Sequence, residues 1–386
     1  MTRSGNSVAT SSNFSIRPKL LFVGAFPPVG GKVIGGMVTA CAKLMASDFP
    51  ALVDVDPLDT TQISNPPPGL HIRGLYAIKR FFSYIERIER KRPDAVLLFA
   101  SAGASFLEKG LMAWYARIRG VPALLFPRGG ALIASAERSP YSRRIIKFCA
   151  SGATKFLCQG PRWQQFAHEV CGFSIDDAPI IPNWTATQDL LDIGRSREPL
   201  PPSRPVQLVF VGWLDRSKGV MELLNAAEAL APKFEFTLVF AGEGNVSDLA
   251  RKFVANAGLD KRVRFYGWIK EEELQSLLGQ SHVFVLPSYA EGLPNAMIEA
   301  MAAGLAVVVT SVGNIPDFVE DGKSGIVVER RNAAALQAAL SSLLGNRGAI
   351  TSLGIAAHNL ASEQFSTNVA VQKLVSTINE ATMDLT

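Results

Sequence analysis

Cysteine and histidine are scarce in this chain of 386 residues. There are four of each, and neither a CxxC pair nor an HExxH motif occurs among them. We therefore expect no structural or catalytic zinc site. The cysteine pattern is typical of reduced, mostly buried thiols in a cytoplasmic protein. The residues are Cys41, Cys149, Cys158, Cys171, His71, His168, His282 and His358.

Long apolar runs are also missing. The best candidates for a membrane span, 95–107 and 300–313, are short and rich in small residues, so both are better explained as buried strands that lead into helices. Residues 1–16 are rich in Ser, Thr and Asn and lack an apolar segment, which predicts a disordered leader and not a signal peptide. The whole chain is 48% hydrophobic, which excludes global disorder.

Charge is unevenly distributed along the chain. Residues 1–186 contain 22 Lys and Arg against 12 Asp and Glu, whereas residues 187–386 contain 17 against 22. Basic residues on two amphipathic helical patterns, 72–91 and 139–149, favour contact with an anionic membrane surface. We therefore expect a cytoplasmic protein, peripheral at the inner face of the membrane. No nucleic-acid partner is expected, because no recognition motif accompanies the charge.

Apolar runs and helical patterns alternate throughout, which predicts parallel α/β structure. A proline-rich linker, 187–205, separates two doubly wound domains, 17–186 and 206–362, and a last helix, 363–386, is expected to pack back on the N-terminal domain. Expected strands are 19–24, 52–55, 95–99, 123–126, 155–158, 179–181, 207–212, 235–241, 263–266, 283–286, 306–310 and 325–328. Expected helices are 36–47, 72–91, 105–119, 139–149, 161–170, 220–230, 246–257, 271–278, 294–303, 333–344 and 363–383.

The most informative segment is 287–303, PSYAEGLPNAMIEAMAA. Pro294 suits the first turn of a helix, so Glu291 lies in the preceding loop and Glu299 lies within the helix. The backbone N–H groups from Gly292 onward offer donors to a phosphate, and the two carboxylates offer acceptors to hydroxyls. A ligand rich in both groups, such as a sugar nucleotide, fits this pattern.

A second segment, 209–220 (VFVGWLDRSKGV), reads as a strand, a glycine-containing turn and the start of a helix. Arg216 and Lys218 place positive charge beside the turn, where a lysine can reach a diphosphate in a cleft at the strand ends.

Together these segments resemble the retaining GT-B glycosyltransferases of family 4, the group 1 glycosyltransferases. Further similarities occur in order at IPNW (181–184), AGEGN (241–245), VRFYGWI (263–269) and PDFVEDGKSGIVV (316–328), so that the resemblance covers about 19–380. It implies a GT-B fold: two Rossmann-like, doubly wound domains facing a central cleft, with the acceptor on the first domain and the donor on the second.

The resemblance also implies roles for matching residues. Lys218 would bind the donor diphosphate, and Glu291 would contact the donor sugar; these two are the expected catalytic residues. Glu299 would hold the ribose hydroxyls, while Gly292 and Leu293 would present the loop to sugar and phosphate.

Further substrate-binding residues are expected, and the sequence departs from the family pattern at two of these places, Trp213 and Arg128. Ile269 would offer backbone groups to the base. Trp213 stands where the family commonly has an arginine, so Arg216 is expected to replace that charge. Gly31 belongs to a glycine-rich loop, 27–36, similar to the family's loop near the donor phosphates, and Arg128 takes the place of a histidine-containing turn.

The implied function is transfer of a sugar from a nucleotide-diphosphate sugar to a lipid-linked or saccharide intermediate of surface polysaccharide synthesis. The resemblance implies retention of configuration with no required metal, and the nucleotide sugar is a co-substrate, so no other cofactor is expected. Three alternatives remain: an epimerase or hydrolase on the same fold, a non-catalytic nucleotide-sugar binder, and a Rossmann oxidoreductase. The absent GxGxxG motif argues against the last.

Overall fold

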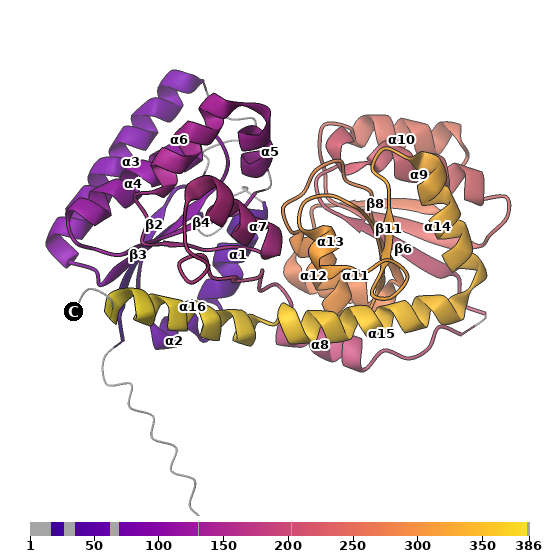
Figure 1. Cartoon of the computed structure of the whole chain (residues 1–386). Coiled ribbons are helices and arrows are strands. Elements are labelled where there is room, and N and C mark those ends of the chain that lie inside the picture. The colour runs from indigo at the N-terminus through magenta and orange to yellow at the C-terminus, as the bar shows by residue number, and fades with distance from the viewer. Residues whose placement is uncertain (1–16, 27–34, 62–68, 130, 202, 384–386) are drawn as a thin grey trace, which may run out of the picture.

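Two parallel β-sheets, one in each half of the chain, divide the molecule into two lobes (Figure 1). The computed structural model describes residues 17–26, 35–61, 69–129, 131–201 and 203–383. The predicted leader and Gly31 therefore lie outside the described residues. Within them, the α/β class and the two parallel-sheet, Rossmann-like units of the sequence prediction are confirmed.

The N-terminal sheet contains β1 (Lys19–Gly24), β2 (Asp54–Asp59), β3 (Ala95–Ala100), β4 (Ala123–Pro127) and β5 (Lys155–Phe156). Its order is β2-β1-β3-β4-β5, and all paired strands are parallel. The helices of this half are α1 (Gly36–Met45), α2 (Phe49–Leu52), α3 (Leu70–Lys91), α4 (Ala104–Ile118), α5 (Ala131–Arg138), α6 (Pro140–Ala150) and α7 (Pro161–Phe166), which runs into a π-helical turn, Ala167–Cys171.

The central strand β3 is buried along its whole length, because helices cover both faces of the sheet. Leu97 and Phe99 pack on the face covered by α1 and α2, whereas Val96 and Leu98 pack on the face covered by α3, α4 and α6. This arrangement explains why the strand is a continuous apolar run in the sequence. The four cysteines are buried free thiols.

The C-terminal sheet contains β6 (Val206–Val211), β7 (Phe236–Ala241), β8 (Val263–Gly267), β9 (Val283–Leu286), β10 (Ala306–Thr310) and β11 (Ile326–Val328). It is also parallel, in the order β11-β10-β9-β6-β7-β8. Its helices are α8 (Gln188–Arg195), the 3₁₀ turn η2 (Arg216–Lys218), α9 (Val220–Leu230), α10 (Ser247–Asn256), α11 (Glu271–Gln280), α12 (Asn295–Ala302), α13 (Ile315–Phe318), α14 (Ala333–Gly345) and α15 (Arg347–Gln364).

The strand order of the C-terminal sheet reverses between β6 and β9. The chain leaves β6 toward β7 and β8 on one side, then returns to place β9 against the other side of β6. Such a switch point opens a crevice at the carboxyl ends of the strands, where ligands of open α/β sheets bind. The loops after β6 and β9 are the two segments that the sequence singled out.

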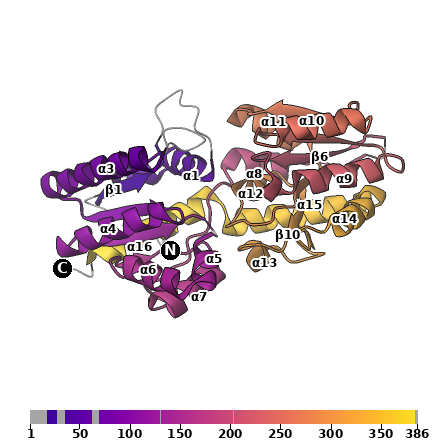
Figure 2. The same ribbon diagram turned by 90° about the horizontal axis from the view of Figure 1, so that it is seen from above.

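The last helices join the two lobes. Figures 1 and 2 show α15 along the C-terminal lobe and α16 (Thr367–Met383) along the N-terminal one. Leu374 and Ile378 of α16 are fully buried in the N-terminal core, beside α2 and β3. Among the described residues, no helix has both the length and the apolar character needed to cross a membrane.

The structure differs from the sequence prediction where apolar patterning is weak. The expected strand 52–55 is instead the end of α2 followed by β2, an edge strand in which only Leu58 is buried. Helices α5 and α15 were not predicted, and α8 occupies part of the expected linker through the buried pair Leu190 and Leu191. Helix α15 is rich in small residues because it packs closely: a Cβ on Gly354 would lie 2.4 Å from the carbonyl oxygen of Gly304.

Candidate active site

A cleft of about 560 Å³ lies between the lobes. Its C-terminal wall is formed by the ends of β6, β7 and β9, the loop after β8, and α12, while α1 and the end of β4 contribute from the N-terminal lobe. Because all strands of both sheets are parallel, their carboxyl ends bring loops from distant parts of the sequence to the same gap.

Lys218 is positioned by the short turn after β6. Asp215 caps this turn by accepting a hydrogen bond from the Ser217 N–H, at 3.2 Å. Gly219 follows with a φ of +69°, and a Cβ there would lie 2.2 Å from the carbonyl oxygen of Pro287. The glycine is therefore required both for the left-handed backbone and for close packing against the loop after β9. This packing brings the side chain of Lys218 to that loop.

Glu291 receives Lys218 in the loop between β9 and α12. Lys218 Nζ lies 2.6 Å from Glu291 Oε1, and the Ser288 hydroxyl donates to the same oxygen at 2.7 Å. Thr310, at the end of β10, also fixes the loop, because its hydroxyl donates a hydrogen bond to the Ser288 carbonyl oxygen at 2.6 Å. Gly313, with a φ of +58°, also packs on it, since a Cβ would lie 2.3 Å from the Glu291 carbonyl oxygen.

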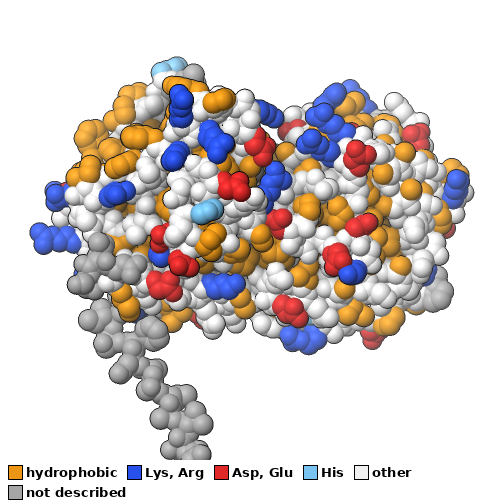
Figure 3. Space-filling model, in the orientation of Figure 1, with side chains coloured by type: hydrophobic (Ala, Val, Ile, Leu, Met, Phe, Trp, Pro, Cys, Tyr) orange, Lys and Arg blue, Asp and Glu red, His pale blue; other side chains and the backbone are white. Residues whose placement is uncertain are grey.

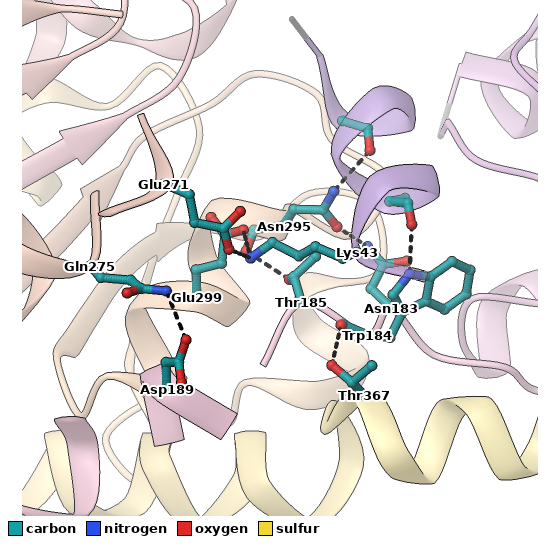
Figure 4. Close-up of polar contacts among 12 residues, drawn as sticks. Lys43, Asn183, Trp184, Thr185, Asp189, Glu271, Gln275, Asn295, Glu299 and Thr367 are labelled. Atoms are coloured by element: carbon teal, nitrogen blue, oxygen red, sulfur yellow. Dashed lines mark hydrogen bonds and ion pairs between the residues drawn. The ribbon is translucent and has the colours of Figure 1, made fainter. Parts of the chain in front are cut away.

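Glu299 lies one turn into α12, which begins at Asn295 with Pro294 as its N-cap residue. It is only 4% exposed and forms an ion pair across the lobes with Lys43 of α1, at 2.9 Å. Lys43 also pairs with Glu271, at 3.2 Å (Figure 4). This cluster therefore joins one ammonium to two carboxylates.

The charges of this cluster shift its pKa values. Burial tends to lower the pKa of Lys43, but the Glu299 and Glu271 carboxylates outweigh burial and raise it. Burial raises the pKa of Glu299, and Glu271 adds to that rise, while Lys43 opposes it. The single ammonium thus stays charged, and the cluster keeps spare capacity to accept hydrogen bonds from hydroxyl groups.

Asn183 links the lobes beside this cluster. Its Nδ2 group donates to the Leu293 carbonyl oxygen and to Asn295 Oδ1, both at 2.8 Å, and its Oδ1 accepts from Gln159 at 2.7 Å. Trp184 donates its ring N–H to the Ala40 carbonyl oxygen of α1 at 2.8 Å (Figure 4). These bonds connect the IPNW segment to both walls of the cleft and fix the start of α12.

Aromatic side chains form the end of the cleft near β8. Trp213 and Trp268 meet edge to face, with ring centroids 4.7 Å apart, and both line the cleft together with Ile269. Flat apolar rings next to backbone polar groups are suited to a nucleobase.

Arg128 lies at the back of the cleft over three aromatic rings. Its guanidinium carbon is 5.3, 4.8 and 4.5 Å from the ring centroids of Phe99, Phe126 and Trp184. Burial lowers the pKa of Arg128 to about 10, so the side chain remains cationic at neutral pH.

Most of the residues expected from the sequence line one cleft: Arg128, Lys218, Ile269, Glu291, Gly292, Leu293 and Glu299. Arg216 is exposed and is not among the residues that line the cleft, so its expected phosphate contact stays a prediction; Trp213 lines the wall. Sequence reasoning missed Lys43, Glu271 and Asn295. Lys43 could have been found by the argument applied to Glu299, since it is a lone charge in an apolar helix.

Metal ligands are not grouped in this region. Among the residues that the structure describes, no cluster of three or more His, Cys, Asp or Glu side chains could hold a metal ion.

The sequence of the C-terminal lobe identifies its family. Residues 205–346 match the family described as Glycosyl transferases group 1. The C-terminal domain is a group 1 glycosyl transferase domain. This group 1 domain contains Lys218, Glu291 and Glu299.

Relatives of known role agree with this assignment. An amylovoran biosynthesis glycosyltransferase of Erwinia amylovora is 28% identical over 180 residues, 44% of each chain. A lipopolysaccharide core biosynthesis glycosyltransferase of Rhizobium meliloti is 28% identical over 187 residues, 48% of this chain and 53% of that protein. The matched segments thus span about half the length of these relatives.

Solved structures extend the similarity to both lobes. Sucrose-phosphate synthase of Thermosynechococcus elongatus has a TM-score of 0.75 at 19% identity, covering 94% of this chain and 99% of that one. Anabaena HepE, solved with UDP-glucose, has a TM-score of 0.68 at 16% identity, covering 94% and 100%. The fold of this chain is therefore GT-B.

Proposed function

We propose that the chain is a retaining glycosyltransferase that moves a sugar from a nucleoside-diphosphate sugar to an acceptor held against the N-terminal lobe. The observation that carries the proposal is the 2.6 Å ion pair between Lys218 and Glu291, in the same cleft as Glu299. One cation for a diphosphate and two carboxylates for hydroxyls complement a ligand that has both groups.

The leaving diphosphate is the part of the donor that Lys218 serves. An ammonium has three N–H donors, so Lys218 binds Glu291 and a phosphate oxygen at once. As the bond from the anomeric carbon to the phosphate oxygen breaks, negative charge grows on the diphosphate, and a preorganised cation stabilises it. With this charge in place, we propose that the reaction needs no metal.

Retention of configuration follows if the acceptor attacks from the face that the diphosphate leaves. The acceptor hydroxyl oxygen bonds to the anomeric carbon while its proton passes to the departing phosphate oxygen, so no protein base is required. Glu291 accepts a hydrogen bond from a sugar hydroxyl and orients the ring.

The nucleoside occupies the other end of the cleft. The Lys43–Glu299–Glu271 cluster accepts hydrogen bonds from the ribose hydroxyls, and Trp213, Trp268 and Ile269 surround the base. The presence of UDP-glucose in the structurally similar HepE supports a uridine donor, although the fold alone is shared at 16% identity.

The acceptor belongs to surface polysaccharide synthesis in this proposal. The support is the printed role of the relatives in amylovoran and lipopolysaccharide core synthesis. Intermediates of such pathways are attached to lipids. An acceptor of this kind would bring the N-terminal lobe close to a membrane surface.

The N-terminal lobe carries a surface suited to a membrane, which we call the apolar ridge. Three helices, α3, α4 and α6, expose large apolar side chains, and α4 packs against both α3 and α6. On this lobe Figure 3 shows apolar patches with basic residues among them. The ridge consists of Ile72, Leu75, Tyr76, Ile78, Phe82, Leu107, Leu111, Ile118, Tyr141 and Phe148. Apolar insertion together with anionic lipid attraction holds such helices at an interface.

The activity is tested by the Lys218→Ala variant. We expect kcat to fall about 100-fold or more, the usual loss for a group that stabilises charge in the transition state. Lys323→Ala is the matched control, because Lys323 pairs with a carboxylate at the same 2.6 Å on an exposed surface. The donor is first found by thermal shift with UDP-, GDP- and ADP-sugars, and NMR of the product reports the anomeric configuration. A Lys218→Ala enzyme within twofold of wild type would refute the assignment.

Membrane binding is tested by sedimentation with vesicles of phosphatidylserine and phosphatidylcholine. Phe82→Asp should abolish binding to the anionic vesicles. Ile355→Asp, which changes a similarly exposed apolar residue on the other lobe, should leave vesicle binding unchanged. Equal binding of the two variants to the anionic vesicles would exclude the apolar ridge as the membrane-binding surface.

A further inference from the structure

A second pocket of about 790 Å³ adjoins the donor cleft, and the two share Arg128, Glu291 and Gly292. It lies between α5, the start of α6 and the start of α7 on one side and the loops after β9, β10 and β11 on the other. We call it the arginine pocket, because Arg128, Arg138, Arg162 and Arg330 line it.

Positive charge in the arginine pocket is not neutralised by its own residues. Within the described ranges, Arg138 of the N-terminal lobe and Arg330 of the C-terminal lobe have no ion-pair partner. The two carboxylates that line the pocket are both engaged: Glu137 contacts Arg162 at 3.4 Å, and Glu291 pairs with Lys218. The pocket therefore presents unpaired guanidinium groups from opposite walls.

Two buried N–H donors occur among the residues that line the pocket. Asn314, which lines the pocket and is 1% exposed, has a buried Nδ2 group without a hydrogen-bond partner in the described part of the chain, and so does Nη1 of Arg128. Buried N–H groups without acceptors are costly, and native proteins rarely leave them so. Since guanidinium and amide nitrogens are donors only, the missing partner is a hydrogen-bond acceptor.

We propose that the arginine pocket binds an anionic group of the acceptor, a phosphate or diphosphate, beside the hydroxyl that receives the sugar. This inference rests on the proposed function, in which Glu291 and Gly292 meet the donor sugar. The residues that the two pockets share are then the place of reaction, and Arg138 and Arg330, which line only the arginine pocket, bind the acceptor's charge. Arginine is suited to this task because its planar fork binds two phosphate oxygens at once.

The same chemistry occurs in two kinds of acceptor. A soluble sugar phosphate and a polyprenyl diphosphate-linked sugar both offer phosphate oxygens near sugar hydroxyls. A neutral saccharide does not, so the inference narrows the acceptor to a phosphorylated compound.

Titration calorimetry on the full chain tests the proposal. The donor cleft is first filled with saturating UDP, so that added phosphate cannot bind beside Lys218. Glucose 6-phosphate and glucose are then titrated in one arm, and vesicles with or without a polyprenyl diphosphate in the other. The variants are Arg138→Ala and Arg330→Ala, and Arg195→Ala is the control because it is an exposed arginine that lines neither pocket.

The expected result is binding of a phosphorylated probe that each variant weakens about tenfold, the loss of one charge-assisted hydrogen bond, with UDP affinity and the Arg195→Ala control unchanged. The arm in which this occurs identifies the source of the phosphate. Equal affinity for glucose and glucose 6-phosphate, together with no effect of either variant on the vesicles, would overturn the inference. Failure of UDP, GDP and ADP to bind would instead refute the proposed function, so the two failures are distinguishable.

Discussion

Removing the Lys43 ammonium should destabilise the protein strongly, because it leaves the Glu299 carboxylate buried without a cation. Lys43 is 7% exposed and Glu299 4%, so water compensates only in part for the lost partner. Breaking a buried ion pair from one side costs about 3–5 kcal/mol, since the remaining charge keeps its desolvation penalty. We expect a loss of this size in the free energy of unfolding of Lys43→Met at pH 7.5.

An exposed ion pair serves as the control that separates the effect of burial from the effect of the ion-pair contact itself. Lys323 and Glu320 are closer, at 2.6 Å against 2.9 Å, but their side chains are 73% and 64% exposed. Exposed pairs contribute about 0–1 kcal/mol, so Lys323→Met should change stability by no more than that.

The double variant Lys43→Met/Glu299→Gln completes the test. It removes both charges, so it should be more stable than Lys43→Met alone, and the double-mutant cycle should give a coupling energy of about 2 kcal/mol or more. Urea denaturation followed by tryptophan fluorescence measures the wild type, Lys43→Met, Glu299→Gln and the double variant, which form the cycle, and Lys323→Met as the control. A loss below about 1 kcal/mol for Lys43→Met, or no gain in the double variant, would refute the reasoning.

Three further outcomes are expected. Gly313→Ala should lower the free energy of unfolding by several kcal/mol and lower kcat, because its Cβ would clash with the Glu291 carbonyl at 2.3 Å. Gly120 has a similar φ but open space around it, so Gly120→Ala should lower the free energy of unfolding by about 1 kcal/mol and leave kcat unchanged. Burial, aided by Arg197, lowers the pKa of His282 to about 4. The unfolded chain therefore binds a proton there below about pH 6.5 while the folded chain does not, so stability should fall by up to about 3 kcal/mol between pH 6.5 and 4. This loss of stability should be smaller in His282→Asn, measured by urea midpoints across pH. An equal loss in the variant would exclude His282 as the cause of the pH dependence. Leu374→Ala in α16 should lower the free energy of unfolding by about 2–5 kcal/mol, whereas Ile355→Ala at an exposed position should lower it by less than about 0.5 kcal/mol. Equal losses in calorimetric scans would contradict the packing of α16 on the N-terminal core.

Several site features were predictable because they depend on local sequence. An apolar run such as Val283–Leu286, followed by a loop and a proline, specifies a buried strand and the start of a helix in any fold of this class. Glu299 stood out as a charge in an apolar helix. The expected contact of Arg216 with a phosphate stays a prediction, because spacing alone does not say which side chain of a one-turn helix faces the cleft.

The amino-acid sequence by itself determined the α/β class, the positions of most strands and the groups able to bind a phosphate or a hydroxyl, because periodicity and turn residues act over a few positions. Only the tertiary structure decided which of these groups meet. Lys218 reaches Glu291, 73 residues away, because β9 pairs beside β6. Lys43 neutralises Glu299 because the two lobes close on each other. Contacts of this kind depend on strand order and on the burial of whole domains, which no short stretch of sequence encodes.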